Sequence, residues 1–304
     1  MIVLKSNLKE LSSDGHIWLH VFFEKMEYKI EFCNDYPKDK LSQLVGLMNA
    51  SFPDCEFKEE YYGWQYMDNP NGRVVSYNAY AEDGQLAAHY AAIPIKMVLD
   101  GKEELGLLSL NTATHPDHQG KRLFTTLADK TYQKAAELGY KYVIGVANAN
   151  STHGFLKYLG FYLVAPLEFK VGIGDIFKNA NINNKNRVLY DAESLKWRLQ
   201  SPEFKYSYLG KTIYGNRKEP LFHASIGVLP EWANNEELGI KKAFDVFNIY
   251  VGLGLDKKGG FYRNLPKFVK RSPFNLIFKD LTGGTMPVIT PENIFFQLID
   301  YDVA

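Results

Sequence analysis

The chain has 304 residues, enough for one large domain or two ordinary ones. Its 35 basic residues balance 35 acidic residues, which argues against a nucleic-acid partner and against an anionic membrane surface. With only two cysteines, Cys33 and Cys55, no disulfide framework is expected, and a reducing, cytoplasmic location is favoured. Neither a signal peptide nor a membrane span is expected from the hydropathy pattern.

Two strands followed by two helices are predicted in the first seventy residues. Alternating apolar residues over 17–23 and 28–32 predict two strands. Apolar residues at helical spacing predict helices over 38–50 and 61–67, and the Asn-Pro-Asn-Gly sequence at 69–72 predicts a turn after the second helix.

A group of hairpins follows this turn. Asp83-Gly84 and Asp100-Gly101 are hairpin dipeptides and separate three predicted strands. The predicted elements from here to the middle of the chain are strands over 74–81, 85–99 and 104–113, a helix over 123–138, a strand over 142–147 and a helix over 151–159.

The stretch from Thr114 to Phe124 connects a predicted strand to a predicted helix. It contains Gly120, and Lys121 and Arg122 stand immediately before the helix. Unpaired backbone N–H groups and the positive end of a helix dipole make such a connection a suitable anion site. The two basic side chains add positive charge there. An ordinary strand–helix connection explains these residues equally well when they are taken alone.

A later segment favours the anion site. The loop Thr114-His115-Pro116…Gln119-Gly120-Lys121-Arg122-Leu123-Phe124 is followed, after the strand over 142–147, by a segment that begins at Asn148 and ends in Leu159-Gly160-Phe161. In this order and at this separation the pair resembles the GCN5-related N-acyltransferase (GNAT) superfamily, over about residues 75–175. The resemblance implies an α/β (α+β) fold with a mixed, largely antiparallel sheet flanked by helices.

The resemblance also implies that the loop holds the pyrophosphate of acetyl-CoA or another short-chain acyl-CoA. The residues expected to bind this co-substrate are Thr112, Ala113, Thr114, Gln119, Gly120, Lys121, Arg122, Leu123, Phe124, Thr125, Asn148, Asn150 and Phe155. Arg122 and Phe124 depart from the family pattern, which has glycine and a small residue there. A backbone amide at Arg122 serves equally well provided that φ stays negative. Asn148 and Asn150 are also typical of a helix cap.

The sequence is less informative about proton transfer. By resemblance, a backbone N–H near Asn111 faces the thioester oxygen. Leu156 stands where many family members have Tyr, and the strand over 105–113 contains no carboxylate. The catalytic candidates are therefore His153, His89 and Asn111. A surface histidine and a hydrogen-bonded strand histidine are the structural alternatives for the two histidines.

A short segment in the second half of the chain is weakly similar to one in the first half. An Asn-rich stretch over 179–186 predicts a linker, and beyond it the segment Trp64…Pro70 recurs as Trp197…Pro202, about one domain length later. We predict two tandem GNAT-like domains: residues 1–176 bind acyl-CoA, and residues 177–304 shape the acceptor site without a pyrophosphate loop. Chance similarity of two short segments is the alternative.

The second half, rich in aromatic residues and without strong charge, favours a large, neutral-to-anionic acceptor. Longer GNAT members that the chain resembles acylate nucleotide-linked amino sugars for surface polysaccharides, and we predict this acceptor, with Trp64, Tyr66 and Tyr90 on its side. An aminoglycoside, polyamine or peptide amine is the alternative acceptor. A non-catalytic acyl-CoA-binding protein is the alternative of another class.

Two histidine pairs invite a metal site. His16 with His20 and His115 with His118 have suitable spacing, but neither pair has the further ligands that zinc requires. We therefore expect no metal and no partner beyond the small-molecule acceptor, and leave a homodimer open.

Overall fold

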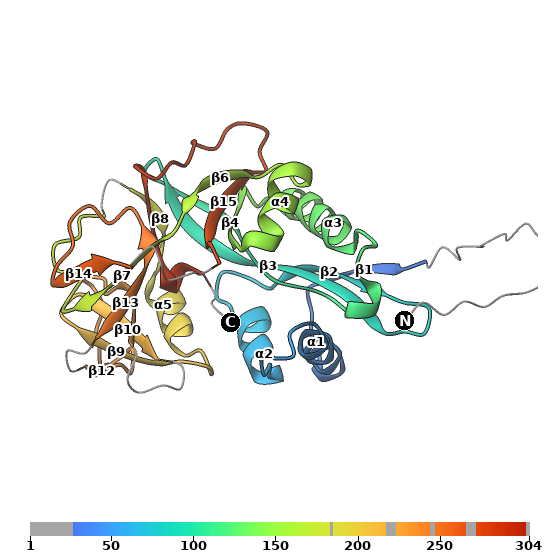
Figure 1. Cartoon of the computed structure of the whole chain (residues 1–304), viewed down its shortest axis with the longest axis horizontal. Coiled ribbons are helices and arrows are strands. Elements are labelled where there is room, and N and C mark those ends of the chain that lie inside the picture. The colour runs from blue at the N-terminus through green and yellow to red at the C-terminus, as the bar shows by residue number, and fades with distance from the viewer. Residues whose placement is uncertain (1–26, 183–184, 217–222, 244–246, 266–271, 302–304) are drawn as a thin grey trace, which may run out of the picture.

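The computed structural model describes residues 27–182, 185–216, 223–243, 247–265 and 272–301. Figure 1 shows an elongated arrangement in which a larger part of strands and helices lies beside a smaller part built mainly of strands. The strand predicted over 17–23 and the pair His16 and His20 lie outside the described residues.

The helices that the structure describes are α1 (Lys38–Ser51), α2 (Glu59–Met67), α3 (Leu123–Glu137), α4 (Ala149–Tyr158) and α5 (Ala192–Leu199), with short 3₁₀ turns η1 (Pro116–His118) and η2 (Leu298–Asp300). The strands are β1 (Lys29–Cys33), β2 (Val75–Tyr80), β3 (Leu86–Leu99), β4 (Lys102–Thr114), β5 (Tyr142–Ala147), β6 (Tyr162–Pro166), β7 (Glu168–Ile173), β8 (Asn186–Val188), β9 (Lys205–Leu209), β10 (Thr212–Asn216), β11 (His223–Val228), β12 (Lys241–Lys242), β13 (Asn248–Leu253), β14 (Phe261–Asn264), β15 (Asn275–Asp280) and β16 (Ile294–Gln297).

The larger part is built on strands in the order β1-β2-β3-β4-β5-β15-β6. All neighbours in this order are antiparallel except β4 and β5, which run parallel. At the β3–β4 turn, Asp100 and Gly101 both have positive φ, 47° and 78°, as the two-residue turn predicted from Asp-Gly requires. The predicted mixed fold, with a largely antiparallel sheet flanked by helices, is confirmed.

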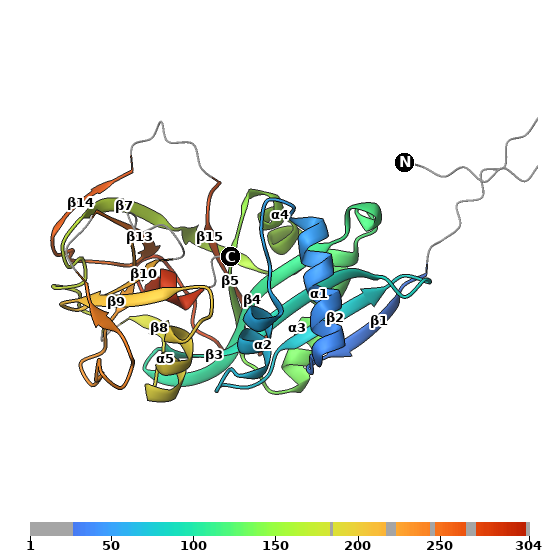
Figure 2. The same ribbon diagram turned by 90° about the horizontal axis from the view of Figure 1, so that it is seen from below.

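Helices cover both faces of this sheet: α1 and α2 pack on one face, and α3 and α4 pack on the other (Figure 2). Because side chains alternate along a strand, the consecutive Leu107 and Leu108 of β4 join different cores. Leu107 packs in the α3–α4 core with Leu127, and Leu108 packs in the α1–α2 core with Leu44. The helices and strands predicted between residues 28 and 159 agree with the structure to within two residues at each end.

The smaller part repeats this strand pattern. Its strands β9, β10 and β11 are antiparallel neighbours, β13 is parallel to β11, and β7 and β14 follow as antiparallel neighbours. The sequence of relations matches that of β2, β3, β4, β5, β15 and β6 in the larger part. This correspondence supports the prediction of a tandem arrangement.

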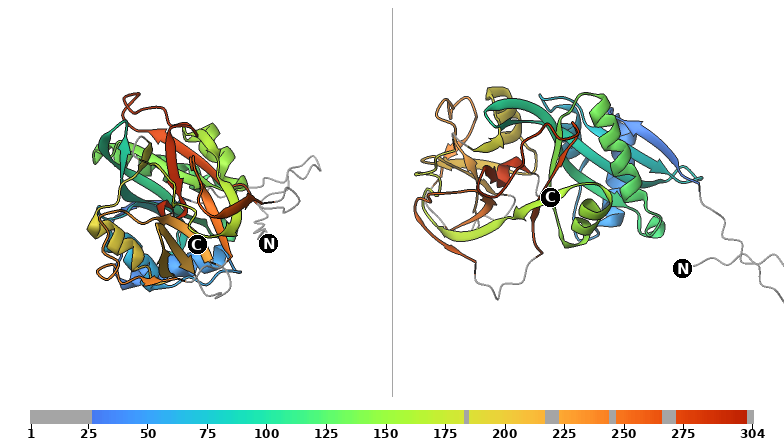
Figure 3. Two further views of the ribbon diagram at one scale, coloured as in Figure 1. Left: turned by 90° about the vertical axis from the view of Figure 1, so that its left-hand side faces the viewer. Right: turned by 90° about the horizontal axis from the view of Figure 1, so that it is seen from above.

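The two halves exchange strands. From the second half of the chain, β15 inserts between β5 and β6 of the larger part, and from the first half β7 pairs with β13 and β14 of the smaller part. Figure 3 shows the crossing segments from two further sides. The boundary predicted at residue 176 therefore cuts across both exchanges, because it assigns β15 and β7 by their order in the chain.

The two tryptophans that begin the similar sequence segments are in contact in the structure. Trp64 of α2 and Trp197 of α5 stack with ring centres 4.8 Å apart. Each indole N–H donates to the backbone oxygen of the other residue, at 3.0 and 3.2 Å. Such a reciprocal contact is what two segments related by an approximate two-fold axis would make.

Candidate functional site

The strands β4 and β5 separate beyond their third pair. Their parallel ladder runs from Leu107–Val143 to Ser109–Gly145 and then stops. Beyond it, β4 continues beside β3 as far as Thr114, and β5 continues beside β15 as far as Ala147. We call the region between these diverging ends the fork; its sides are residues 110–114 of β4 and 146–147 of β5.

A β-bulge shapes the β4 side of the fork. The β3–β4 register shifts opposite His89–Ala91, and Asn111 has a φ of 46°. Asparagine tolerates this left-handed conformation better than most residues, and bulges re-aim the backbone next to functional sites. The Asn111 side chain donates to Gln65 Oε1 of α2. The contact fixes the side chain, and the predicted role of Asn111 in the reaction rests on its backbone N–H.

The connection from β4 to α3 is tightly turned. It passes through η1, and Gly120 and Arg122 have φ values of 74° and 60°. The condition that φ stays negative at Arg122 is therefore not met: the arginine adopts the left-handed conformation for which the family pattern supplies glycine. An L-residue pays roughly 1–2 kcal/mol for this conformation, so the surrounding loop must impose it.

The N-terminus of α3 is an open positive end. Arg122 is its N-cap and makes no side-chain capping bond, and its carbonyl accepts the N–H of Thr126 at 3.1 Å. The N–H groups of residues 123–125 precede that first helical bond, where an α-helix offers no backbone acceptor. The first turn carries no acidic residue, and Lys121 and Arg122 are exposed beside it. The arrangement suits a phosphate group.

The N-terminus of α4, unlike that of α3, is capped by a side chain, that of Asn148. The Asn148 Oδ1 accepts the N–H groups of Asn150 and Ser151 at 3.0 and 2.9 Å. Capping is thus the role that the structure displays for Asn148, and its contact with a coenzyme stays a prediction. His153, one turn further on, is exposed, with its ring 5.9 Å from that of Tyr158. Its catalytic role also stays a prediction.

Phe124, which replaces a small residue, bridges α3 and α4. Its ring lies where a side chain at Gly154 would stand, since an added Cβ would be 2.8 Å from Phe124 Cε1. The ring also packs edge-on against Phe155, with centres 5.3 Å apart. Phe155 and Leu123 are buried in the α3–α4 core. Both side chains hold the two helices together, and the predicted coenzyme contacts of Leu123, through its backbone N–H, and of Phe155 stay predictions.

His89 is a core residue. It is 1% exposed, its Nδ1 lies 2.7 Å from Asn78 Oδ1, and its Nε2 lies 2.9 Å from the Tyr66 hydroxyl. Burial lowers the pKa of His89 to about 3, so the ring is neutral at physiological pH. Its prediction as a catalytic base is corrected, because both ring nitrogens are engaged within the core.

The three predicted acceptor residues are buried as well. Trp64 stacks on Trp197, Tyr66 bonds His89, and the Tyr90 hydroxyl lies 2.6 Å from Ser109 Oγ and also contacts the Tyr132 hydroxyl. None of the three presents its ring on the surface. Their assignment to the acceptor is corrected, since each has a structural partner inside the molecule.

A comparison with protein families matches residues 34–164 to the acetyltransferase (GNAT) domain. Residues 34–164, 131 of the 304, are therefore identified as a GNAT domain. The matched range extends from just before α1 into β6, so it contains the fork, the bulge and the N-terminus of α3. The resemblance drawn from the two sequence segments is confirmed, and an N-acyltransferase is the class of enzyme that it indicates.

Solved structures share the GNAT-type fold over most of the chain. A probable N-acyltransferase from Enterococcus faecalis is 11% identical, with 84% of this chain and 73% of that chain covered at a TM-score of 0.57. A GCN5-related N-acetyltransferase from Anabaena variabilis is 10% identical, with 84% and 74% covered at a TM-score of 0.56. At these identities the likeness concerns the fold alone. A search of curated proteins found no match.

No set of three His, Cys, Asp or Glu side chains in the described part of the chain is arranged to hold a metal ion. His118 instead bonds the Tyr28 hydroxyl at 2.9 Å and Gln85 Oε1 at 3.0 Å. None of the described helices is long and apolar enough to cross a membrane.

Proposed function

We propose that this GNAT protein transfers an acetyl or other short acyl group from acyl-CoA to a primary amine. One observation carries the proposal: β4 borders the fork as far as Thr114, and the connection that follows it leads into the N-terminus of α3, which has no side-chain cap. A donor that joins a pyrophosphate to a long amide-bearing arm requires an anion site and, beside it, strand edges with free hydrogen-bonding groups.

The pyrophosphate is assigned to the loop and the first turn of α3. The N–H groups of residues 123–125 bind its oxygens, and Lys121 and Arg122 supply positive charge. The arm is assigned to the fork, where Thr112 to Thr114 border it on the β4 side. The family-derived contacts of Gln119, Asn148 and Asn150 belong to the same proposal.

The reaction takes place where the fork begins. The amine nitrogen forms the new C–N bond, the C–S bond breaks, and its electron pair leaves with sulphur. The backbone N–H at the Asn111 bulge supports the negative charge that develops on the thioester oxygen. A thiol with a pKa of about 8.5 leaves readily as thiolate, so the amine is the group that chiefly needs a base. His153 is our candidate for it.

For the acceptor we propose a nucleotide-linked amino sugar, used in the cytoplasm. Support comes from the aromatic residues at the junction of the two parts. Phe169 of β7 and Phe274, which precedes β15, are half-buried with ring centres 5.5 Å apart. Their position next to the end of β5 offers apolar ring faces to a sugar or base.

The donor assignment is tested by charge reversal. We expect Lys121→Glu combined with Arg122→Glu to weaken acetyl-CoA binding by about tenfold or more, because two attractive charges near the pyrophosphate become repulsive. Calorimetric titration measures the Kd. Lys130→Glu, an exposed change later in α3, is the control and should leave the Kd within about twofold. Unchanged binding in the double variant would contradict the pyrophosphate site.

The acceptor is tested by the release of coenzyme A from acetyl-CoA across a panel of amines. The panel contains nucleotide-linked amino sugars, aminoglycosides, polyamines and peptides with free N-termini. Turnover confined to the amino-sugar nucleotides supports the proposal, and turnover confined to another group replaces the acceptor. Tight acetyl-CoA binding without turnover of any amine would favour a non-catalytic binding protein.

A further inference from the structure

Tyr301 comes from the far end of the chain but lies beside the fork. Its ring stacks on Phe296 of β16, with centres 5.7 Å apart, and packs edge-on to Phe274 at 6.3 Å. Phe274 directly precedes Asn275, the partner of Ala147 at the end of β5. The tertiary fold therefore carries a C-terminal tyrosine to the end of β5 that borders the fork.

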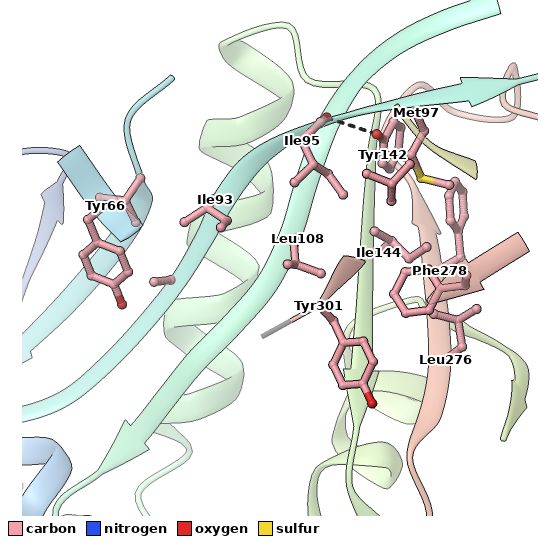
Figure 4. Close-up of a cluster of buried hydrophobic side chains, with 14 of the residues drawn as sticks. Tyr66, Ile93, Ile95, Met97, Leu108, Tyr142, Ile144, Leu276, Phe278 and Tyr301 are labelled. Carbon is pink, nitrogen blue, oxygen red and sulfur yellow. Dashed lines mark hydrogen bonds between the residues drawn. The ribbon is translucent and has the colours of Figure 1, made fainter. Parts of the chain in front are cut away.

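Tyr301 also shares a core cluster with both sides of the fork. The cluster contains Leu108 of β4 and Ile144 of β5, and Leu110 and Val146, the first residues beyond the last ladder pair, pack against it. In Figure 4 the Tyr301 ring lies beside Leu108 and Ile144, and its phenolic oxygen points away from both of them.

The Tyr301 hydroxyl lacks a hydrogen-bond partner among the described residues, although the residue is only 5% exposed. Two other tyrosines are satisfied: the buried Tyr142 donates to the oxygen of Ile95 at 3.1 Å, and the half-buried Tyr190 donates to that of Ile299 at 2.9 Å. A buried hydroxyl without a partner costs stability, which calls for a compensating role. Burial raises the pKa of Tyr301, so the group keeps its proton at neutral pH and acts as a donor.

We propose that the Tyr301 O–H donates a hydrogen bond to the thioester carbonyl oxygen of the acyl donor, as a second donor beside the backbone N–H at Asn111. The inference rests on the proposed function, since it places the acyl donor in the fork. As the amine adds to the carbonyl carbon, the oxygen gains negative charge, and it returns that charge when the C–S bond breaks. Tyr301 keeps its proton throughout; the amine proton passes to the base.

Tyr301→Phe removes one oxygen atom and tests this role. We expect kcat to fall roughly 100-fold, as for loss of one oxyanion donor, while the acetyl-CoA Kd changes less than about threefold. The melting temperature should stay the same or rise, because no hydrogen bond within the protein is lost. Tyr190→Phe is the matched control: it loses the bond to Ile299, so it should melt earlier and retain kcat.

A second measurement needs no acceptor amine. The infrared band of ¹³C-labelled acetyl-CoA bound to the intact protein reports hydrogen bonding to its carbonyl oxygen. We expect the band at a lower frequency in the wild type than in Tyr301→Phe, with Tyr190→Phe like the wild type. An identical band in wild type and Tyr301→Phe, or an unchanged kcat, overturns the inference while leaving the proposed function intact. Failure of the wild type to bind acetyl-CoA would instead overturn the proposed function.

Discussion

At the scale of single residues, the burial of His89 makes the stability of the protein depend on pH. Its pKa is about 3 in the folded state and about 6.5 when unfolded, so below pH 6.5 the unfolded chain binds the extra proton. Its contribution to stability is therefore complete above pH 6.5 and is lost as pH falls toward 3. We expect the free energy of unfolding to decrease by up to about 1.4 kcal/mol per pH unit below pH 6 on account of His89 alone. Urea unfolding at several pH values measures it.

His89→Gln serves as the control for this dependence, since glutamine retains polar atoms in the site and does not titrate. The variant should be less stable at pH 7 but should show a shallower decline in acid. Equal slopes for the two proteins would show that other groups govern acid unfolding.

At the scale of elements, the alignment of β4 with β5 sets the origin of the fork. Gly106 of β4 lies against the Tyr142 ring of β5, and a Cβ added there would lie 2.5 Å from it. Tyr142 is held by stacking on Phe278 and by its bond to Ile95, so it has little room to move. We expect Gly106→Ala to lower the free energy of unfolding by about 1–3 kcal/mol, through overpacking. Chemical denaturation measures the change.

A glycine-to-alanine substitution in α1 should have the opposite effect on the free energy of unfolding. Gly46 is exposed within this helix, and an added Cβ would meet no atom within 4 Å. Alanine there should stabilise the protein by roughly 0.5–1 kcal/mol, because glycine loses more conformational freedom in a helix. If Gly106→Ala left the free energy of unfolding unchanged while Gly46→Ala raised it, the result would show that the Tyr142 ring moves aside easily.

At the scale of the whole molecule, the strand exchange makes the two halves interdependent. A fragment 1–176 lacks β15, so β5 and β6 lose the strand between them, and a fragment 177–304 lacks β7. We expect the full chain to unfold in one cooperative transition, and fragment 1–176 alone to bind acetyl-CoA at least tenfold more weakly or to aggregate through its open strand edges. Calorimetry and binding titration measure these outcomes.

Co-expression of the two fragments provides the control, because it returns β15 and β7 to their sheets. Restored binding would agree with the exchange. Two well-separated thermal transitions in the full chain would show instead that each half holds its strands independently.

Local patterns in the sequence determined the elements and suggested the proposed donor loop. The strand at 142–147, the helix at 38–50 and the proposed anion site before Leu123 follow from periodicity, turn dipeptides and a short motif, all of which act between residues close in the chain. The match to the GNAT domain covers this same region. The sequence also contained the two similar segments with Trp64 and Trp197, but only the fold showed that these two residues are in contact.

The tertiary structure alone decided which residues are buried, which strands are exchanged and what reaches the fork. His89, Tyr66 and Tyr90 have polar groups that suit a site, and only their packing shows that these groups bond one another or the core. The sequence did not indicate a role for Tyr301, because its contacts with Phe274 and Phe296 depend on strand pairing and not on spacing along the chain. Local propensity selects helices and strands, whereas long-range pairing, driven by burial of apolar surface, selects the residues that meet at the site.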